Sequence, residues 1–236
     1  MYRIMVLIAL VLSLNINAEI DDFENIPRMM VGPGEWNGKI KNSRAYGYGV
    51  LRFGKDYSYK YEGEFDNDRA NGRGKLWYPT GKYYEGEFKN GFADGYGKYN
   101  EVNGLTYEGE WKSGFFHGKG TMKFPNGDLY IGEWAKGRKN GKGKYTFASG
   151  GYEEGVWINS KLDGFGKYYW PDGSRYVGEF KNDKFHGQGI KYNSKGEYYK
   201  GEFKNGKGNG YGEYYDKDGN MIVKGIWKDN KLVEHQ

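Results

Sequence analysis

The sequence predicts an all-β protein, an elongated antiparallel β-meander or open solenoid built from hairpin repeats of about 23 residues. Two observations carry this prediction. An aromatic residue, a glycine two places later and a second aromatic at the fifth place recur along the chain. Within each copy nonpolar and polar residues alternate, which is the period of a β-strand. The third-place glycines, spaced 23 to 25 residues apart, are Gly38, Gly63, Gly86, Gly109, Gly132, Gly155, Gly178, Gly201 and Gly225.

The composition supports a repeat array over a single compact core. The 236 residues include 41 glycines and 24 tyrosines but few aliphatic side chains, so each unit must pack mainly on its neighbours. The absence of cysteine excludes disulfides, thiol catalysis and cysteine-ligated metals. A net charge of +5 is a mild excess, and we expect no nucleic-acid partner.

Four segments divide the chain. Residues 1–18 resemble a signal peptide, with Arg3 before an apolar run that is too short to span a bilayer. This predicts export to a periplasm, the extracellular space or a secretory lumen. Residues 19–33 read as an acidic linker, residues 34–228 as the repeat array and residues 229–236 as a C-terminal tail.

Each repeat is predicted to be a hairpin. Tyr61–Phe65 alternates like a strand, residues 66–71 form a polar turn, and residues 72–78 form the return strand. Counting from the opening aromatic as place 1, places 1, 3, 5, 12, 14 and 16 share one face, where glycines let rings approach the backbone. Glu at places 2 and 4 and Lys or Arg at places 13 and 15 occupy the other face. No part of the array reads as a helix.

The pattern Tyr-x-Gly-x-Trp/Phe, followed by Gly-x-Gly, resembles the MORN repeat (membrane occupation and recognition nexus). The resemblance covers about residues 36–228, with eight full repeats and a partial ninth at Val223–Trp227. Repeat 1 has Trp36 at the opening place. Repeat 6 has Glu153 there and Tyr152 one place early, so a local bulge is expected. The resemblance implies an extended β-strip that joins proteins to membranes or cytoskeletal partners, often as a dimer, and no separate catalytic domain fits into this chain.

The first candidate site is the aromatic face. Its rings either form an exposed groove for a peptide, another copy of the chain or a stacked glycan, or pack on each other and on the glycines. The candidate residues are Tyr61, Phe65, Tyr84, Phe88, Tyr107, Trp111, Tyr130, Trp134, Trp157, Tyr176, Phe180, Tyr199 and Phe203.

The second candidate is a basic run in the region of repeats 4 and 5, where no acidic residue lies between Glu133 and Glu153. Such a cluster suits an anionic membrane surface. The alternative is a solvated hairpin tip. The candidate residues are Lys136, Arg138, Lys139, Lys142 and Lys144.

No catalytic, cofactor or metal site is predicted. His117 and His186 stand at place 11, just before Gly-x-Gly, where a turn role at positive φ is expected. The paired glutamates recur too regularly along an open strand to indicate acid–base catalysis. The sequence therefore predicts a non-enzymatic binding or scaffold protein that acts through protein–protein contact or self-association. Attachment to an anionic membrane and glycan binding are the alternatives.

Overall fold

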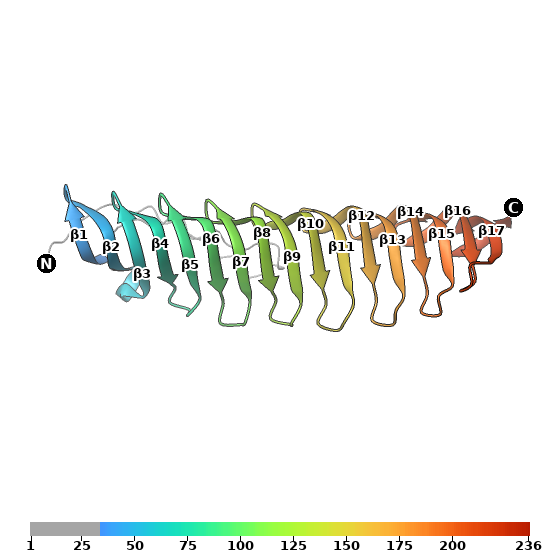
Figure 1. Cartoon of the computed structure of the whole chain (residues 1–236), viewed down its shortest axis with the longest axis horizontal. Coiled ribbons are helices and arrows are strands. Elements are labelled where there is room, and N and C mark those ends of the chain that lie inside the picture. Colours follow the sequence, from blue (N-terminus) through green and yellow to red (C-terminus); the bar gives the residue numbers. More distant parts are fainter. Residues whose placement is uncertain (1–33) are drawn as a thin grey trace. The chain divides into compact units, whose positions relative to one another are not determined.

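A computed structural model describes residues 34–236 and confirms the predicted all-β class of antiparallel hairpin repeats. The predicted signal peptide and acidic linker lie outside the described residues. The described chain divides into two compact units, one comprising residues up to Pro125 with Trp134–Arg138, the other Asn126–Glu133 with Lys139–Gln236. In both units, strands that follow one another in the chain pair with each other (Figure 1).

The first unit contains eight complete strands and one turn of 3-10 helix, η1, among its described residues. Asp56 and Tyr57 in η1 have left-handed φ angles, so this turn is not a regular helix and the predicted absence of helices from the array stands for the described residues. The bounds are β1 Gly34–Lys41, β2 Arg44–Phe53, η1 Lys55–Tyr57, β3 Tyr59–Asp66, β4 Arg69–Trp77, β5 Tyr83–Lys89, β6 Phe92–Asn100, β7 Thr106–Lys112 and β8 Phe115–Lys123. Strand β9, Leu129–Ala135, has residues in both units, and β10 begins at Arg138, the last residue of the first unit.

The second unit continues the same pattern, and strands reach into the segment predicted as a tail. Strand β18 pairs with β17 through Trp227 and Leu232. The bounds are β10 Arg138–Thr146, β11 Tyr152–Ile158, β12 Lys161–Tyr169, β13 Arg175–Lys181, β14 Lys184–Tyr192, β15 Tyr198–Lys204, β16 Lys207–Tyr215, β17 Met221–Lys228 and β18 Lys231–His235.

The turn inside each repeat is tighter than predicted. In the second repeat it consists of Asn67 and Asp68 alone, and both have left-handed φ angles, as a type I′ turn requires. Asn, Asp and Gly dominate these positions because they tolerate that conformation best. The turns also join successive repeats, since the N–H of Gly91 donates to the carbonyl of Ala70 at 2.8 Å.

The two glycines of Gly-x-Gly have different roles, and the predicted placement of the first one on the aromatic face is wrong. Gly118, at place 12, has φ of 52° and forms a β-bulge. A Cβ there would meet the carboxylate of Glu110, which accepts the N–H of Lys119 at 2.9 Å. The place-4 glutamate therefore caps a bulge as well as making the surface polar. The positive φ belongs to this glycine and not to His117 before it.

The core is a column of rings over paired glycines. Gly109 and Gly120 face each other on β7 and β8, and a Cβ on either would overlap the Tyr107 side chain. The Tyr107 hydroxyl donates to the carbonyl of Glu110 at 2.9 Å. The Trp111 indole donates to the carbonyl of Gly97 in the preceding repeat at 3.1 Å. Hydrogen bonds therefore fix both rings while their faces and edges pack.

Replacing Gly120 with valine should destabilise the array, because the new side chain would occupy the space of the Tyr107 ring. Overpacking costs roughly 1–3 kcal/mol, and at this chain length each kcal/mol lowers the unfolding midpoint by about 2–4 °C. Thermal circular dichroism measures the change. Thr121→Val, at the adjacent residue on the opposite face, is the matched control. Equal midpoints for the two variants would contradict this packing.

Candidate functional site

The thirteen candidate aromatic residues form the core and not an exposed face. Each is at most 9% exposed. Each opening tyrosine packs edge-on against the place-5 ring of the next repeat, and most of them also pack edge-on against the place-5 ring of their own repeat. Tyr176 lies 5.2 Å from Phe180 and 5.0 Å from Phe203, at interplanar angles of 87° and 81°. Of the two expected outcomes, ring-on-ring packing is the one observed, and glycan stacking on these rings is excluded by their burial.

The basic run of repeat 5 is divided between the surface and the core. Lys136 and Arg138, at the turn between β9 and β10, are exposed. The Lys139 ammonium instead points into the core, 3.9 Å from the centre of the Trp157 ring. Lys142 and Lys144 are exposed on the face opposite the rings, which we call the ladder face (places 2, 4, 13 and 15). Adjacent residues of a strand point to opposite faces, so a run in sequence is divided in space.

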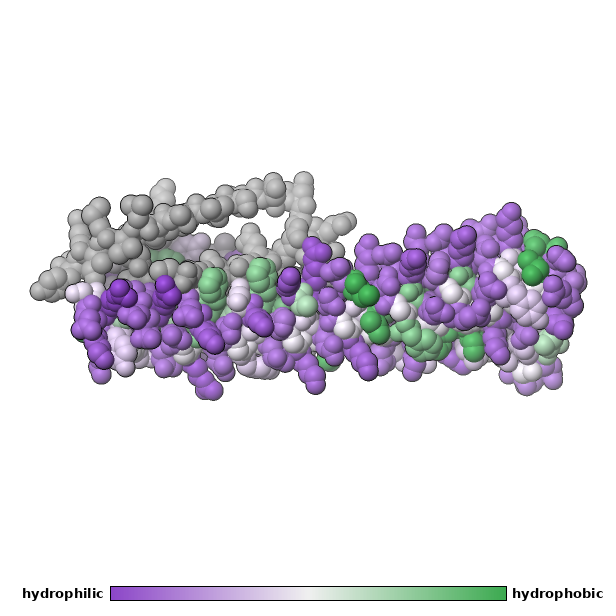
Figure 2. Space-filling view, turned by 90° about the horizontal axis from the view of Figure 1, so that it is seen from above, coloured by the Kyte–Doolittle hydropathy of each residue, from purple (hydrophilic) through white to green (hydrophobic). Residues whose placement is uncertain are grey.

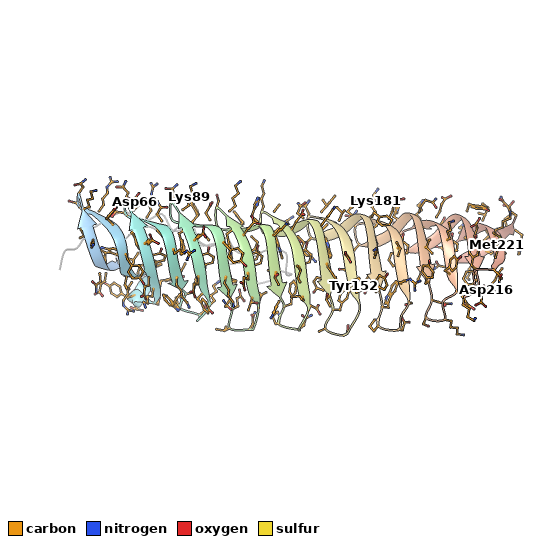
Figure 3. All side chains as sticks on the ribbon, viewed as in Figure 1. Asp66, Lys89, Tyr152, Lys181, Asp216 and Met221 are labelled. Carbon is orange, nitrogen blue, oxygen red and sulfur yellow. The ribbon has the colours of Figure 1, made fainter. Side chains whose placement is uncertain are left out.

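A different set of cations gathers at one end of the strands. In the second unit, places 6 and 9 flank four consecutive two-residue turns, and seven of these eight positions are exposed lysines. Figure 3 shows Lys181 at this end and Tyr152 and Asp216 at the opposite end. Viewed from the side of these turns, the surface outside the grey atoms is mostly hydrophilic (Figure 2). We call Lys161, Lys181, Lys184, Lys204, Lys207, Lys228 and Lys231 the turn-lysine edge.

Few acids neutralise the turn-lysine edge. The same turns contain Asp183 and Asp229. Asp183 is engaged by the N–H of Leu162 at 2.7 Å, and Asp229 pairs with Lys207 at 3.2 Å. The remaining lysines exceed the acids, so this edge is strongly positive.

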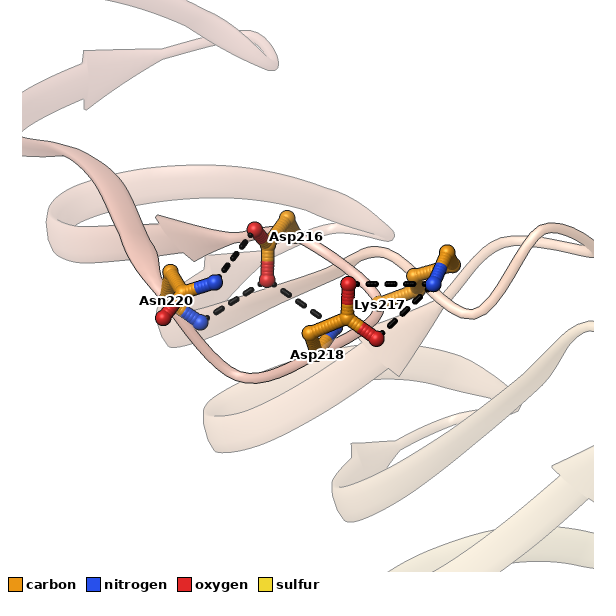
Figure 4. A network of polar contacts seen from close by, with 4 residues as sticks. All are labelled: Asp216, Lys217, Asp218 and Asn220. Atoms are coloured by element: carbon orange, nitrogen blue, oxygen red, sulfur yellow. Dashed lines mark hydrogen bonds and ion pairs between the residues drawn. The ribbon is translucent and has the colours of Figure 1, made fainter.

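The opposite end of the second unit is acidic, and its carboxylates are largely engaged locally. Asp216 accepts hydrogen bonds from the backbone of Asp218 and Asn220 at 2.9 and 2.8 Å (Figure 4). Lys217 contacts both carboxylate oxygens of Asp218, at 2.8 and 3.0 Å. These contacts shape the loop. The unit is therefore polarised, with lysines along the turn-lysine edge and acids at the opposite end.

The sequence contains this edge, but not as a run. The lysines of successive turns are separated by about 20 residues, so they become neighbours only when hairpins stack. The signal was present at places 6 and 9 of the repeat, where lysine recurs in register. Examining charge by place along the repeat would have found it.

Repeat 6 departs from the other repeats inside the core. Glu153 occupies the place of the opening tyrosine and pairs in register with Tyr145 and Tyr168. The expected bulge at Tyr152 and Glu153 is absent, because both flanking pairings run through these residues without a shift. The tyrosine place therefore contains a carboxylate in the regular register.

Burial is the main cause that raises the pKa of Glu153, to about 7. The positive charge of Lys139 opposes this shift, and the negative charge of Asp183 adds to it. Lys139 also lies 4.7 Å from the centre of the Tyr145 ring. Repeat 6 thus replaces an aromatic contact with a titratable one.

The ladder face also changes in repeats 6 and 7. In the other repeats most of its residues are charged, as in the 2.8 Å pair between Lys75 and Glu85, although Tyr96 and Ile131 are also exposed on it. In repeats 6 and 7 four of its positions are apolar, and the phenylalanine is 60% exposed. We call Val156, Phe165, Val177 and Ile190 the ladder patch.

No cluster of three or more potential metal-ligating His, Cys, Asp or Glu residues occurs within residues 34–236. His117 and His186 contribute backbone carbonyls that accept the hydroxyls of Tyr107 and Tyr176, both at 3.3 Å. Over the same residues, the structure contains no helix with the length and apolar character needed to cross a bilayer.

The repeat unit identified above matches a family model. The description of that model is MORN repeat. The matched residues are 61–83, 84–105, 107–129, 130–152, 154–175, 176–198 and 199–221. The chain belongs to the MORN repeat family. MORN repeats indicate a binding or scaffold protein, and the family is generally non-enzymatic. Hairpin β1–β2 and strands β17 and β18 extend the array beyond the matched residues.

Two solved structures have a backbone similar to that of this chain. The G-box domain of the microcephaly protein CPAP is 13% identical, with coverage of 83% of this chain and 99% of that chain and a TM-score of 0.49. The Drosophila melanogaster SAS-4 TCP domain, solved with a proline-rich motif of Ana2, is 13% identical, with coverage of 66% and 86% and a TM-score of 0.42. None of the curated proteins compared with this MORN protein matches it.

We expect the MORN array to lose stability as pH rises through about 7. Because the pKa of Glu153 is higher in the folded chain than its usual 4.5, the stabilisation is complete below pH 4.5 and is lost as Glu153 ionises. The size of this pKa shift limits the loss in the free energy of unfolding to about 3 kcal/mol at most. Denaturant unfolding at pH 5 and pH 8 measures the change.

Glu153→Gln should lose most of this pH dependence. Glu154→Gln removes the same charge from the adjacent, exposed ladder-face position and should behave like the wild type. A wild-type pH dependence in Glu153→Gln would assign the effect to other groups.

Proposed function

We propose that this MORN protein is a non-enzymatic scaffold that attaches to anionic membrane surfaces through the turn-lysine edge. The observation that carries the proposal is the row of seven exposed lysines over four consecutive turns. Export, predicted from residues 1–18, is part of the proposal and sets which membrane face is available.

The geometry of the edge suits a flat anionic surface. Successive repeats are two strands apart, so the lysine pairs recur at intervals of about 9.6 Å. A row of this kind can place every ammonium near one plane of head groups. Each lysine near such a surface contributes roughly 1 kcal/mol. The eighth of these positions is Ile158, which is 47% exposed. Because the other seven are lysines, the attraction is mainly electrostatic and should weaken with salt.

The membrane proposal predicts that the full chain floats with phosphatidylserine-containing vesicles and not with phosphatidylcholine vesicles. Changing Lys181, Lys184, Lys204 and Lys228 to Gln should weaken binding at least ~100-fold at low salt, because about 1 kcal/mol is lost per lysine. Flotation across a lipid titration measures the affinity.

The matched control removes four lysines from the ladder face of the same unit, Lys142, Lys144, Lys167 and Lys200, again by change to Gln. It should retain most of the binding. Two of these control residues, Lys142 and Lys144, belong to the basic run predicted from sequence. Equal losses of binding in the two variants would show that the vesicles attract the lysines of this unit nonspecifically. Undiminished binding by the turn variant would reject the edge as the membrane site.

Protein–protein contact is the second candidate function, and the ladder patch favours it. Most ladder positions of the other repeats are charged, so the four apolar side chains of repeats 6 and 7 weaken the solvation of this part of the face. A second copy of the chain is the partner that can be tested directly.

If copies associate through the ladder patch, sedimentation equilibrium should show a dimer that persists at high salt. Phe165→Glu should then weaken association by at least ~10-fold, because a charge would be buried in an apolar contact. Tyr96→Glu changes the equivalent exposed place in another repeat and is the control. A monomer at all concentrations would reject self-association.

A further inference from the structure

Two tyrosine pairs on the ladder-face side of the second unit are stacked face to face. Tyr198 and Tyr215 lie opposite each other on β15 and β16, with ring centres 4.7 Å apart and planes 10° apart. Tyr152 and Tyr169 have the same relation on β11 and β12, at 4.6 Å and 18°. The buried core rings meet mostly edge-on, as Tyr199 and Phe203 do at 88°. The stacked pairs therefore bring ring carbons of two phenols close together over an extended area.

These pairs are also accessible to solvent. All four tyrosines are partly exposed, whereas the core tyrosine next to Tyr198, Tyr199, is buried. An oxidant can therefore reach the stacked phenols without unfolding of the array. With no cysteine in the chain, no thiol competes for the oxidant and no disulfide can join the strands.

One pair has a proton acceptor in place. The Tyr215 hydroxyl donates to a carboxylate oxygen of Glu213 at 2.6 Å. This hydrogen bond is the main cause that raises the pKa of Tyr215, to about 12. Loss of an electron makes a phenol strongly acidic, so an adjacent carboxylate that takes the proton favours formation of the neutral radical. Glu213 in turn pairs in register with Lys200 on β15 and Lys224 on β17.

We propose that Tyr198 and Tyr215, and likewise Tyr152 and Tyr169, are sites of oxidative coupling to dityrosine. The oxidant is hydrogen peroxide used by a haem peroxidase. Each phenol loses one electron and one proton, and a carbon–carbon bond forms between the positions ortho to the two hydroxyls. The rings regain aromaticity by moving the ortho hydrogens to oxygen. In total two tyrosines and one peroxide give one dityrosine and two waters.

The product would link neighbouring strands covalently in a protein that has no cysteine for a disulfide. Each bond would join the two strands of one repeat, β11 with β12 or β15 with β16. It would restrict the unfolded chain as a disulfide does, while leaving the register of the strands unchanged. Glu213 acts as a positioning residue and proton acceptor for one of the two pairs.

The test treats the full chain, diluted to limit intermolecular coupling, with hydrogen peroxide and a haem peroxidase. We expect dityrosine fluorescence and cross-linked peptides that have lost two hydrogens, mapped to both pairs. Tyr215→Phe should remove the Tyr198 cross-link and leave the other. Tyr211→Phe, an exposed tyrosine on the same strand, is the matched control and should change neither.

Glu213→Gln distinguishes coupling that depends on the proton acceptor from coupling that depends only on the solvent exposure of the tyrosines. It should slow coupling of Tyr198 with Tyr215 by at least ~10-fold, because the proton acceptor is lost. The Tyr152–Tyr169 pair is the internal standard and should react at its former rate. Cross-links only between molecules, or only at other tyrosines, would overturn the proposal. Equal rates in Glu213→Gln and the wild type would reject the role of Glu213.

Discussion

The close approach of a tyrosine ring to two facing glycines is the contact on which this structure depends. Gly109 and Gly120 leave bare backbone under Tyr107, and the ring of Trp111 packs against its edge. A side chain at either glycine would displace the ring, so the motif must keep glycine at both places. This requirement accounts for the unusual composition, in which glycine and tyrosine replace the aliphatic core of a globular domain.

Because the core needs only one face of each hairpin, the other face and the turns are free to vary. The turns of the second unit use this freedom to gather lysines at one end, while the loops at the other end contain acids. Charge that appears balanced over the whole chain is therefore separated in space. Binding by this MORN protein is best sought along its turn-lysine edge and ladder face.

Repeat 6 shows how far the motif can be altered while its register is kept. A carboxylate replaces the ring at Glu153, and Val156 replaces the glutamate that caps the bulge in other repeats. Strand pairing through Gly155 and Gly166 is unchanged, because the glycines and the neighbouring rings still fit. We expect the carboxylate of Glu153 to make this part of the core sensitive to pH, whereas Val156 makes the ladder face of repeat 6 less polar.

The sequence by itself determined the repeat, its period, the strand class and the identity of the core rings, because each depends on local spacing along one hairpin. Only the tertiary structure decided which residues are accessible. Tyr107 and its counterparts are buried, so they cannot form the predicted binding surface. Lys139 and Lys142 lie on opposite faces of one strand, so they do not form one basic cluster. The stacking of hairpins brought Lys181 and Lys204 to one edge although 23 residues separate them. Contacts between repeats depend on how the hairpins stack, which the spacing within one hairpin does not determine.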